Sequence, residues 1–146
     1  MIPIIIAAIA DHSYVLEVSA GIVRSKGKIL AMKKGQSKYE YLSFRYEFPG
    51  GKIEPGEIPI DTLKREFQEE LKANLDGAVI KQMRDVYFEY PDFSVRIYPF
   101  LIDIEAFEFK LTEHVDYQWL DLKSINSVDW VAADKIIVEE VAGVDD

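Results

Sequence analysis

Two short runs of sequence decide how this chain folds and what it does. Residues 51–57 read Gly-Lys-Ile-Glu-Pro-Gly-Glu, and residues 65–70 read Arg-Glu-Phe-Gln-Glu-Glu. On a helix, Glu66, Glu69 and Glu70 span about 100° of one face. Like charges three or four residues apart destabilise a helix by roughly 0.2–0.5 kcal/mol per pair, so these carboxylates need compensation. A hard divalent cation, Mg²⁺ or Mn²⁺, supplies it, because such ions prefer oxygen ligands.

The helix that carries these carboxylates is predicted over residues 59–73. Pro59 suits its first position, because that residue needs no backbone N–H there. The apolar residues at a spacing of three and four are Ile60, Leu63, Phe67 and Leu71. For a generic Glu-rich helix the alternative to a metal site is a solvated acidic face, with Lys64 and Lys72 as local partners.

The flanking sequence predicts strands on both sides of this helix. We expect strands at residues 14–24, 29–33, 46–48, 79–90, 93–107 and 117–121, and a mobile loop at 35–43. A final helix is predicted over residues 135–141, with Asp134 at its N-cap. This order of elements predicts an α+β (α/β/α sandwich) fold, in which helices pack on a mixed β-sheet.

Length and composition indicate one ordinary globular domain over residues 1–146. Residues 1–12 are almost wholly apolar, and we expect an N-terminal extension or an extra strand there. They are too few to span a bilayer, which needs about 20 residues. A signal peptide is disfavoured because no lysine or arginine precedes Arg24.

Charge and cysteine content exclude several functions. The absence of cysteine removes disulfides, thiolate metal sites and a cysteine nucleophile, and fits a cytoplasmic protein. With 17 basic and 26 acidic residues, the formal charge of −9 argues against nucleic acid or membrane as a partner. A small polyanion remains compatible, because metal-loaded carboxylates invert the local charge. Monomer and homodimer are both compatible with the sequence.

The spacing of these residues resembles the signature of the Nudix hydrolases, Gly-x5-Glu-x7-Arg-Glu-apolar-x-Glu-Glu. The matching positions are Gly51, Glu57, Arg65, Glu66, Phe67, Glu69 and Glu70. The flanks at residues 46–52 and 130–134 resemble the MutT-type branch, so the likeness runs from about residue 14 to 142. The family usually has an aliphatic residue at position 67, and glycine with an aliphatic residue at 72 and 73. This sequence departs from the family at Phe67, Lys72 and Ala73. The resemblance therefore does not predict how the helix packs at residue 67 or where it ends.

The resemblance implies a Nudix fold and a metal-dependent enzyme that cleaves a nucleoside triphosphate to a monophosphate and pyrophosphate. The ligands it implies for Mg²⁺ or Mn²⁺ are Gly50, Glu66, Glu69, Glu70 and Glu113. Either Glu66 or Glu113 accepts the proton of the attacking water, and Glu113 is equally compatible with a surface position. An orienting role is implied for Glu57 and Arg65, because arginine bridges a carboxylate through two hydrogen bonds.

The substrate contacts are expected from Lys34 (or Lys33), Gly51 and Lys52 for the phosphates, and from Phe48 and Asp134 for the base. Phe48 is equally suited to core packing. An ionised Asp134 only accepts hydrogen bonds, which favours the amine of cytosine and hence CTP or a methylcytosine nucleotide. A protonated Asp134 donates instead, so the alternative is an 8-oxo-dGTP diphosphatase. Two further alternatives are a dinucleoside polyphosphate hydrolase, hinted at by Tyr90, and a non-catalytic nucleotide sensor.

Overall fold

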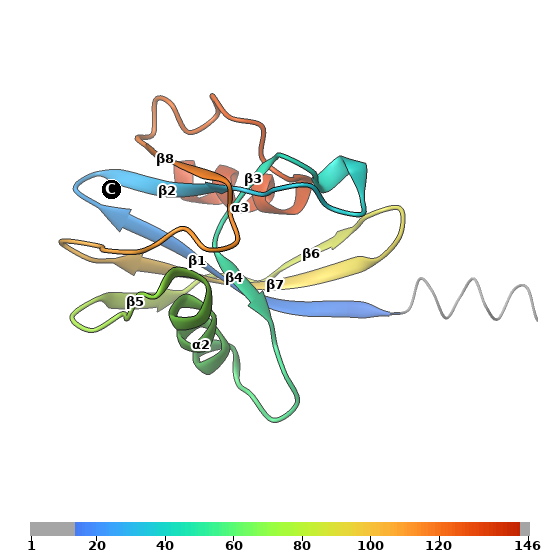
Figure 1. Ribbon diagram of the computed structural model, residues 1–146, viewed down its shortest axis with the longest axis horizontal. Coiled ribbons are helices and arrows are strands. Elements are labelled where there is room, and N and C mark those ends of the chain that lie inside the picture. Colours follow the sequence, from blue (N-terminus) through green and yellow to red (C-terminus); the bar gives the residue numbers. More distant parts are fainter. Residues whose placement is uncertain (1–13, 144–146) are drawn as a thin grey trace, which may run out of the picture.

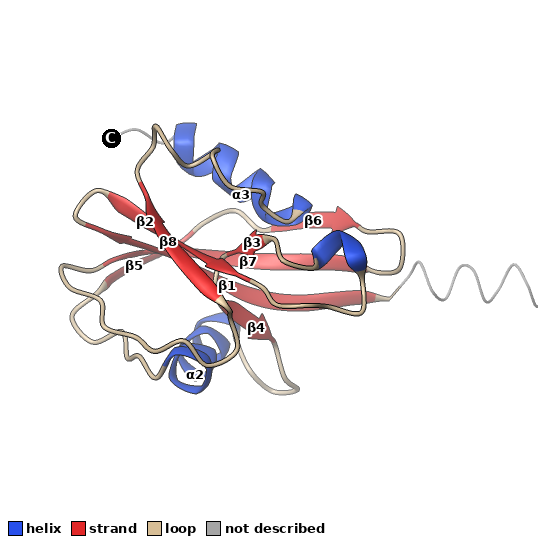
Figure 2. Cartoon of the chain, turned by 45° about the horizontal axis from the view of Figure 1, so that its top comes forward, coloured by secondary structure: helices blue, strands red, loops and turns tan. Residues whose placement is uncertain are grey.

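The computed structural model describes residues 14–143, and the extension predicted at residues 1–12 lies outside this range. One mixed eight-stranded sheet has a helix on each face (Figures 1 and 2), which confirms the α+β prediction. The strands are β1 (Val15–Ser25), β2 (Lys28–Lys33), β3 (Tyr46–Glu47), β4 (Gly50–Lys52), β5 (Val79–Gln82), β6 (Val86–Glu89), β7 (Ser94–Asp103) and β8 (Asp116–Leu120). The helices are α2 (Pro59–Leu71) and α3 (Ala132–Gly143), with a 3₁₀ turn η1 (Glu40–Leu42).

The centre of the sheet is the parallel pair of β1 and β7, which runs from Val15 opposite Ser94 to Arg24 opposite Asp103. All other pairs are antiparallel: β2 and β4 lie along β1, β3 and β8 along β2, and β5 and β6 along β7. Strand β4, which contains the start of the motif at residues 51–70, is therefore bonded directly to the central strand. This pairing holds the start of the motif in a fixed register.

Helix α2 packs on the sheet through the predicted apolar stripe. Leu63, Phe67 and Leu71 are buried, and Ile60 is partly buried beside them. The aromatic ring at position 67 fits because the residue beneath it on β1 is Gly21, where a side chain would overlap that ring. Helix α3 covers the opposite face and buries its own apolar residues in a second core cluster. The sheet thus lies between two cores, one under each helix.

One predicted strand, residues 79–90, is divided into β5 and β6. Gln82 pairs with Phe100 and Val86 with Ile97, so three residues oppose two, and this extra residue forms a bulge. The cause lies on the partner strand, because Pro99 has no N–H to return the bond that its carbonyl accepts from Met83 at 2.8 Å. Continuous pairing across this point is therefore broken.

Three other predicted boundaries also change. Strand β7 ends at Asp103, not at residue 107, because its partner β1 ends at Ser25. Helix α2 ends at Leu71, where Lys72 takes a left-handed conformation with φ of 51°. Helix α3 begins at Ala132, so the prediction that Asp134 is its N-cap is wrong. Among the described residues, no helix is both long and apolar enough to cross a membrane.

Candidate active site

One arginine fixes the loop between β4 and α2 to the helix. Arg65 donates to both carboxylate oxygens of Glu57, at 2.7 and 3.0 Å, and to the Lys52 carbonyl at 3.0 Å. The Glu57 carboxylate also accepts from the backbone N–H of Glu54 and the hydroxyl of Thr62. These donors, the guanidinium first, lower the pKa of Glu57 to about 2. Glu57 is therefore ionised, and the bidentate bridge expected from the sequence is present.

Glu66 is packed against the backbone of β4 because residue 51 is glycine. A side chain at Gly51 would overlap the carboxylate of Glu66, with its two oxygens 2.5 and 2.6 Å from the added carbon. Arg65 holds the same carboxylate at 2.8 Å and reaches Glu69 at 3.2 Å. The Glu66 side chain is only 13% exposed, whereas that of Glu69 is 60% exposed. The two carboxylates therefore differ in how firmly the fold places them.

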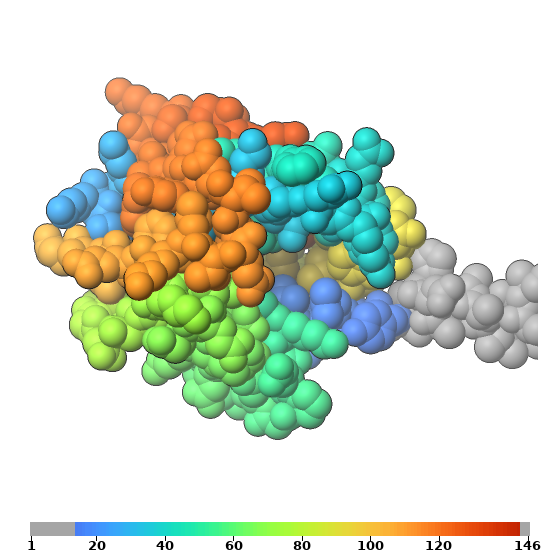
Figure 3. All heavy atoms as spheres, viewed as in Figure 1, coloured from blue at the N-terminus to red at the C-terminus, as the bar shows by residue number. Residues whose placement is uncertain are grey.

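A cavity of about 500 Å³ opens beside this part of α2. Its walls come from β1, the loop after β2, β3, β4, β7, the start of α3 and the segment before β8. In Figure 3 a recess is visible between the orange segment before β8 and the cyan loop after β2. The predicted site residues that line the cavity are Lys34, Gly50, Gly51, Glu70, Glu113 and Asp134. The fold thus brings together residues from five separate stretches of sequence.

Glu70 is a buried carboxyl group with three other glutamates close enough to affect its ionisation. Burial, followed by the charges of Glu66, Glu113 and Glu47, raises the pKa of Glu70 to about 8. Its Oε1 atom is buried and has no hydrogen-bond partner among the described residues. Leaving a buried polar atom unpaired costs about 1–3 kcal/mol, and more for a charged group. Such a carboxylate is suited to bind a cation.

The residues at this position fit a hard divalent ion in their chemistry. Carboxylate and carbonyl oxygens are the ligands that Mg²⁺ and Mn²⁺ prefer. Within residues 14–143, no three His, Asp or Glu side chains are already grouped to hold an ion, and Arg65 instead engages the carboxylates of Glu66 and Glu69. Of the ligands implied by the sequence, Gly50, Glu70 and Glu113 line the cavity, whereas Glu66 and Glu69 are held by Arg65 beside it, and the ligand set stays a prediction.

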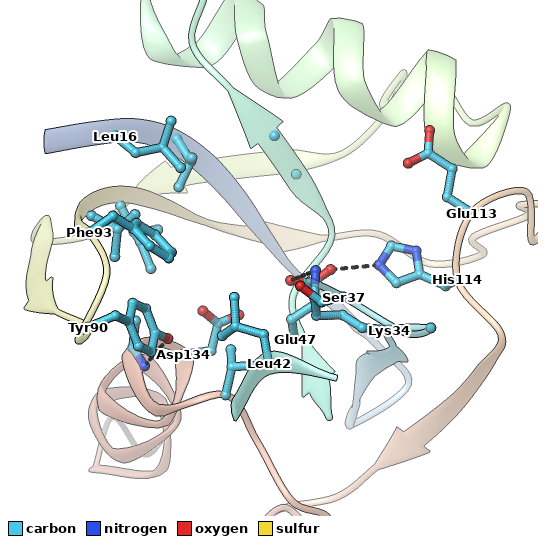
Figure 4. A pocket seen from close by; sticks show the side chains of 18 of the residues that line it. Leu16, Lys34, Ser37, Leu42, Glu47, Tyr90, Phe93, Glu113, His114 and Asp134 are labelled. Carbon is cyan, nitrogen blue, oxygen red and sulfur yellow. Dashed lines mark hydrogen bonds and ion pairs between the residues drawn. The ribbon is translucent and has the colours of Figure 1, made fainter. Parts of the chain in front are cut away.

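Two residues of the cavity that were not predicted, Glu47 and His114, contact each other. The Nε2 atom of His114 lies 2.9 Å from the Oε2 atom of Glu47, whose carboxylate also lies 3.7 Å from the Lys34 ammonium. Figure 4 shows this contact at the cavity wall, with Glu113 next to it. The signals were present, because Glu47 lies in the MutT-like run 46–52 and His114, one of two histidines, follows Glu113 directly.

Asp134 and Tyr90 lie at the other end of the cavity, away from Glu113 and His114 (Figure 4). Asp134 accepts the backbone N–H of Phe48 at 2.8 Å and does not cap α3. The hydroxyl of Tyr90 accepts the Ala133 N–H at 2.9 Å, satisfying a donor in the first turn of the helix. Burial first, then the charge of Glu47, raises the pKa of Asp134 to about 8. Burial therefore favours the neutral form of the Asp134 carboxyl.

Two predicted substrate contacts lie outside the cavity wall. The ring of Phe48 is buried, with its centroid 4.6 Å from that of Trp130, which is the core-packing role left open by the sequence. Lys52 is exposed, and its carbonyl serves the loop through Arg65. Glu57, Glu66 and the guanidinium thus form the support behind the cavity, while Glu70 and Glu113 face it.

The fold and this site together define a hydrolase of the NUDIX domain family, to which the chain belongs: the domain matches residues 14–141. Nudix hydrolases generally use divalent metal ions and act on small-molecule nucleotides. The chain is more particularly a MutT-like Nudix hydrolase, as its relatives indicate. It is 25% identical over 126 residues to the 8-oxo-dGTP diphosphatase of Escherichia coli (strain K12), covering 86% of this chain and 95% of that protein.

Two other similar proteins belong to the same group. The 8-oxo-dGTP diphosphatase of Haemophilus influenzae is 33% identical over 93 residues, covering 61% of this chain and 63% of that protein. The crystal structure of the MutT protein from Methanosarcina mazei Go1 superposes with a TM-score of 0.72 at 23% identity, covering 88% and 92% of the two chains. This likeness concerns the fold. The preference for cytosine nucleotides is not supported by these relatives. Their names give 8-oxo-dGTP, the alternative substrate.

Proposed function

We propose that this protein hydrolyses 8-oxo-dGTP to 8-oxo-dGMP and pyrophosphate in the presence of Mg²⁺. The observation that carries this proposal is the cavity itself, which has converging carboxylates around Glu70 at one end and a buried Asp134 at the other. The first end suits a metal-bound triphosphate and the second suits a base. The names of the relatives support the choice of base. Such an activity acts on the nucleotide pool, which fits a cytoplasmic location.

The hydrolysis adds water across one phosphoanhydride bond. A water oxygen forms a bond to phosphorus, the bond to the bridging oxygen breaks, and the water proton passes to a carboxylate, either Glu66 or Glu113. A bound divalent ion supplies Lewis-acid polarisation of the phosphoryl oxygens and lowers the pKa of a coordinated water. Arg65 fixes Glu57 and Glu66, so that the carboxylates are already in place when the substrate enters.

The protonation of Asp134 favours a guanine base over cytosine, and the names of the relatives support the oxidised form. Its Oδ2 atom accepts the Phe48 N–H, which leaves Oδ1 for the base. With a pKa of about 8, the neutral carboxyl predominates at pH 7 and donates a hydrogen bond to a guanine O6 acceptor. The ionised form only accepts, which suits the cytosine amine. CTP is therefore the second candidate, and it is favoured as the pH rises above about 8.

A nucleotide panel tests the proposal. The purified protein is incubated with Mg²⁺ and 8-oxo-dGTP, dGTP, CTP or diadenosine tetraphosphate, and the products are separated by ion-exchange chromatography. The proposal predicts 8-oxo-dGMP and pyrophosphate as the fastest products. Faster cleavage of CTP would reject the assigned base, and cleavage of the dinucleotide alone would indicate a dinucleoside polyphosphate hydrolase. Tight binding without cleavage of any nucleotide would indicate a sensor.

A further inference from the structure

Glu113 lies on a segment, residues 104–115, that joins β7 to β8 without a helix or strand. Two backbone hydrogen bonds anchor this segment on either side of the carboxylate. Lys110 donates to the carbonyl of the last residue of α2 at 2.8 Å, and Val115 donates to that of the last residue of β2 at 2.9 Å. Between these anchors the backbone is irregular, so side-chain contacts decide where Glu113 is presented.

Such a contact is made by the residue that follows Glu113. The His114 side chain is only 6% exposed, although the segment around it is mostly exposed. A carboxylate only accepts hydrogen bonds, so Nε2 of His114 carries the hydrogen and donates to Oε2 of Glu47 at 2.9 Å. Glu47 belongs to β3, where it pairs with Met32 of β2. The contact therefore ties the irregular segment to the sheet.

Among the described residues, the imidazole of His114 also lacks a hydrogen bond at one of its two nitrogens, whereas a purely structural buried histidine would use both. Its second nitrogen, Nδ1, is buried and has no hydrogen-bond partner in the described part of the chain. Both His114 and Glu47 line the same cavity as Glu70 and Glu113. On the other side of Glu113, the hydroxyl of Thr112 donates to the backbone carbonyl of Glu70. Glu113 is thus flanked by one residue tied to α2 and one tied to β3.

We infer that His114 is a positioning residue, which uses its hydrogen bond to Glu47 to hold Glu113 at the edge of the cavity. The inference rests on the proposed function, because it gives Glu113 a role in metal binding and hydrolysis. His114 bonds to Glu47 and not to Glu113 itself, so it acts through the backbone that the two neighbours share. Loss of a residue that orients a metal ligand from outside the ligand set typically costs about 10–100-fold in metal affinity or activity. His114 acts on the reaction only through Glu113.

A double-mutant cycle with two measurements tests the inference. The variants are His114→Ala, Glu113→Gln and the double variant, with Glu108→Gln as a control, because Glu108 is an exposed carboxylate of the same segment. The free Mn²⁺ concentration is followed by electron paramagnetic resonance to obtain the dissociation constant, and kcat and KM are measured with 8-oxo-dGTP. We expect His114→Ala to weaken Mn²⁺ binding and to lower kcat by about 10–100-fold each, with KM little changed.

The cycle separates positioning from a general structural role. In the Glu113→Gln background, His114→Ala should cause little further loss, and His114→Gln, whose amide N–H replaces the Nε2 donor, should restore most of the wild-type values. If the alanine variant does not fold, His114→Asn repeats the cycle, since its shorter side chain stays polar and does not reach Glu47.

The outcomes also separate this inference from the proposed function. If His114→Ala causes the same loss of Mn²⁺ affinity and kcat in the wild-type protein and in Glu113→Gln, the inference is overturned, even in an active enzyme. It is also overturned if Glu113→Gln alone causes no loss. If no nucleotide is cleaved, the proposed function fails, and the Mn²⁺ dissociation constants alone still decide whether His114 acts through Glu113.

Discussion

Replacing Gly51 with alanine should lower activity on the order of 10²-fold while leaving the fold stable. The added carbon would lie 2.5 and 2.6 Å from the carboxylate oxygens of Glu66, whereas ordinary contact begins near 3.4 Å. The nearest atom is the carboxyl carbon of Glu66, at 2.3 Å, so the group must move by roughly 1.1 Å. A displacement of about 1 Å at a reacting group costs on the order of 10²-fold in rate. Stability should change by less than about 1 kcal/mol, because a flexible side chain yields and alanine suits a strand better than glycine.

The assay compares kcat for 8-oxo-dGTP hydrolysis with the midpoint of urea unfolding. Gly143→Ala is the matched control, because an added carbon there meets no atom within 4 Å, and its kcat and stability should remain near wild type. Retention of full activity by Gly51→Ala would refute the placement of Glu66 against β4. A loss of several kcal/mol in unfolding free energy would show that the backbone, not the carboxylate, takes up the overlap.

Four further predictions concern three residues, Glu70, Asp134 and Lys72. Glu70→Gln should lower kcat by roughly 10²-fold or more with little change in thermal stability, because a neutral amide cannot ionise to bind the divalent ion as a carboxylate does; unchanged turnover would reject the metal assignment. Asp134→Asn should reduce the pH dependence of stability, measured by urea unfolding from about pH 4 to 9: the wild-type carboxyl binds its proton more tightly when folded, so its contribution is present at low pH and is lost as pH rises through about 8. The ratio of 8-oxo-dGTP to CTP turnover should also fall as pH rises through about 8 in the wild type, and a pH-independent ratio would reject Asp134 as the base-reading residue. Lys72→Gly should stabilise the fold by about 1 kcal/mol, because Lys72 has φ of 51°, whereas Lys64→Gly in the helix interior should destabilise it by a similar amount; equal effects would reject this interpretation of the helix end.

The sequence predicted those features that depend on local periodicity and spacing. The stripe of Leu63, Phe67 and Leu71 has the period of a helix that is buried on one side, so the sequence alone could place α2 and its carboxylates. The bridge from Arg65 to Glu57 could also be expected, because the two residues flank the turn between loop and helix. Both features are confirmed by the geometry.

Features that depend on a distant partner could not be predicted. Pro99 interrupts the pairing of a strand about 15 residues away in sequence, and Gly21 makes room for the ring of Phe67 on another element. The same holds for the hydrogen bond that Asp134 accepts from the Phe48 backbone. Glu47 and His114 each lie beside predicted site residues, but their contact across 67 residues of sequence could not be predicted. Hydrogen bonds of this kind leave no periodic signal in the chain.

The most direct test of the central claim is the Mg²⁺ dependence of pyrophosphate release from 8-oxo-dGTP, measured in parallel for the wild-type protein and Glu70→Gln. We predict saturable release of one pyrophosphate per 8-oxo-dGMP that requires Mg²⁺ in the wild type and is reduced by roughly 10²-fold or more in the variant. Release of orthophosphate in place of pyrophosphate, or equal rates for the two proteins, would contradict the account of this cavity as a triphosphate-cleaving site.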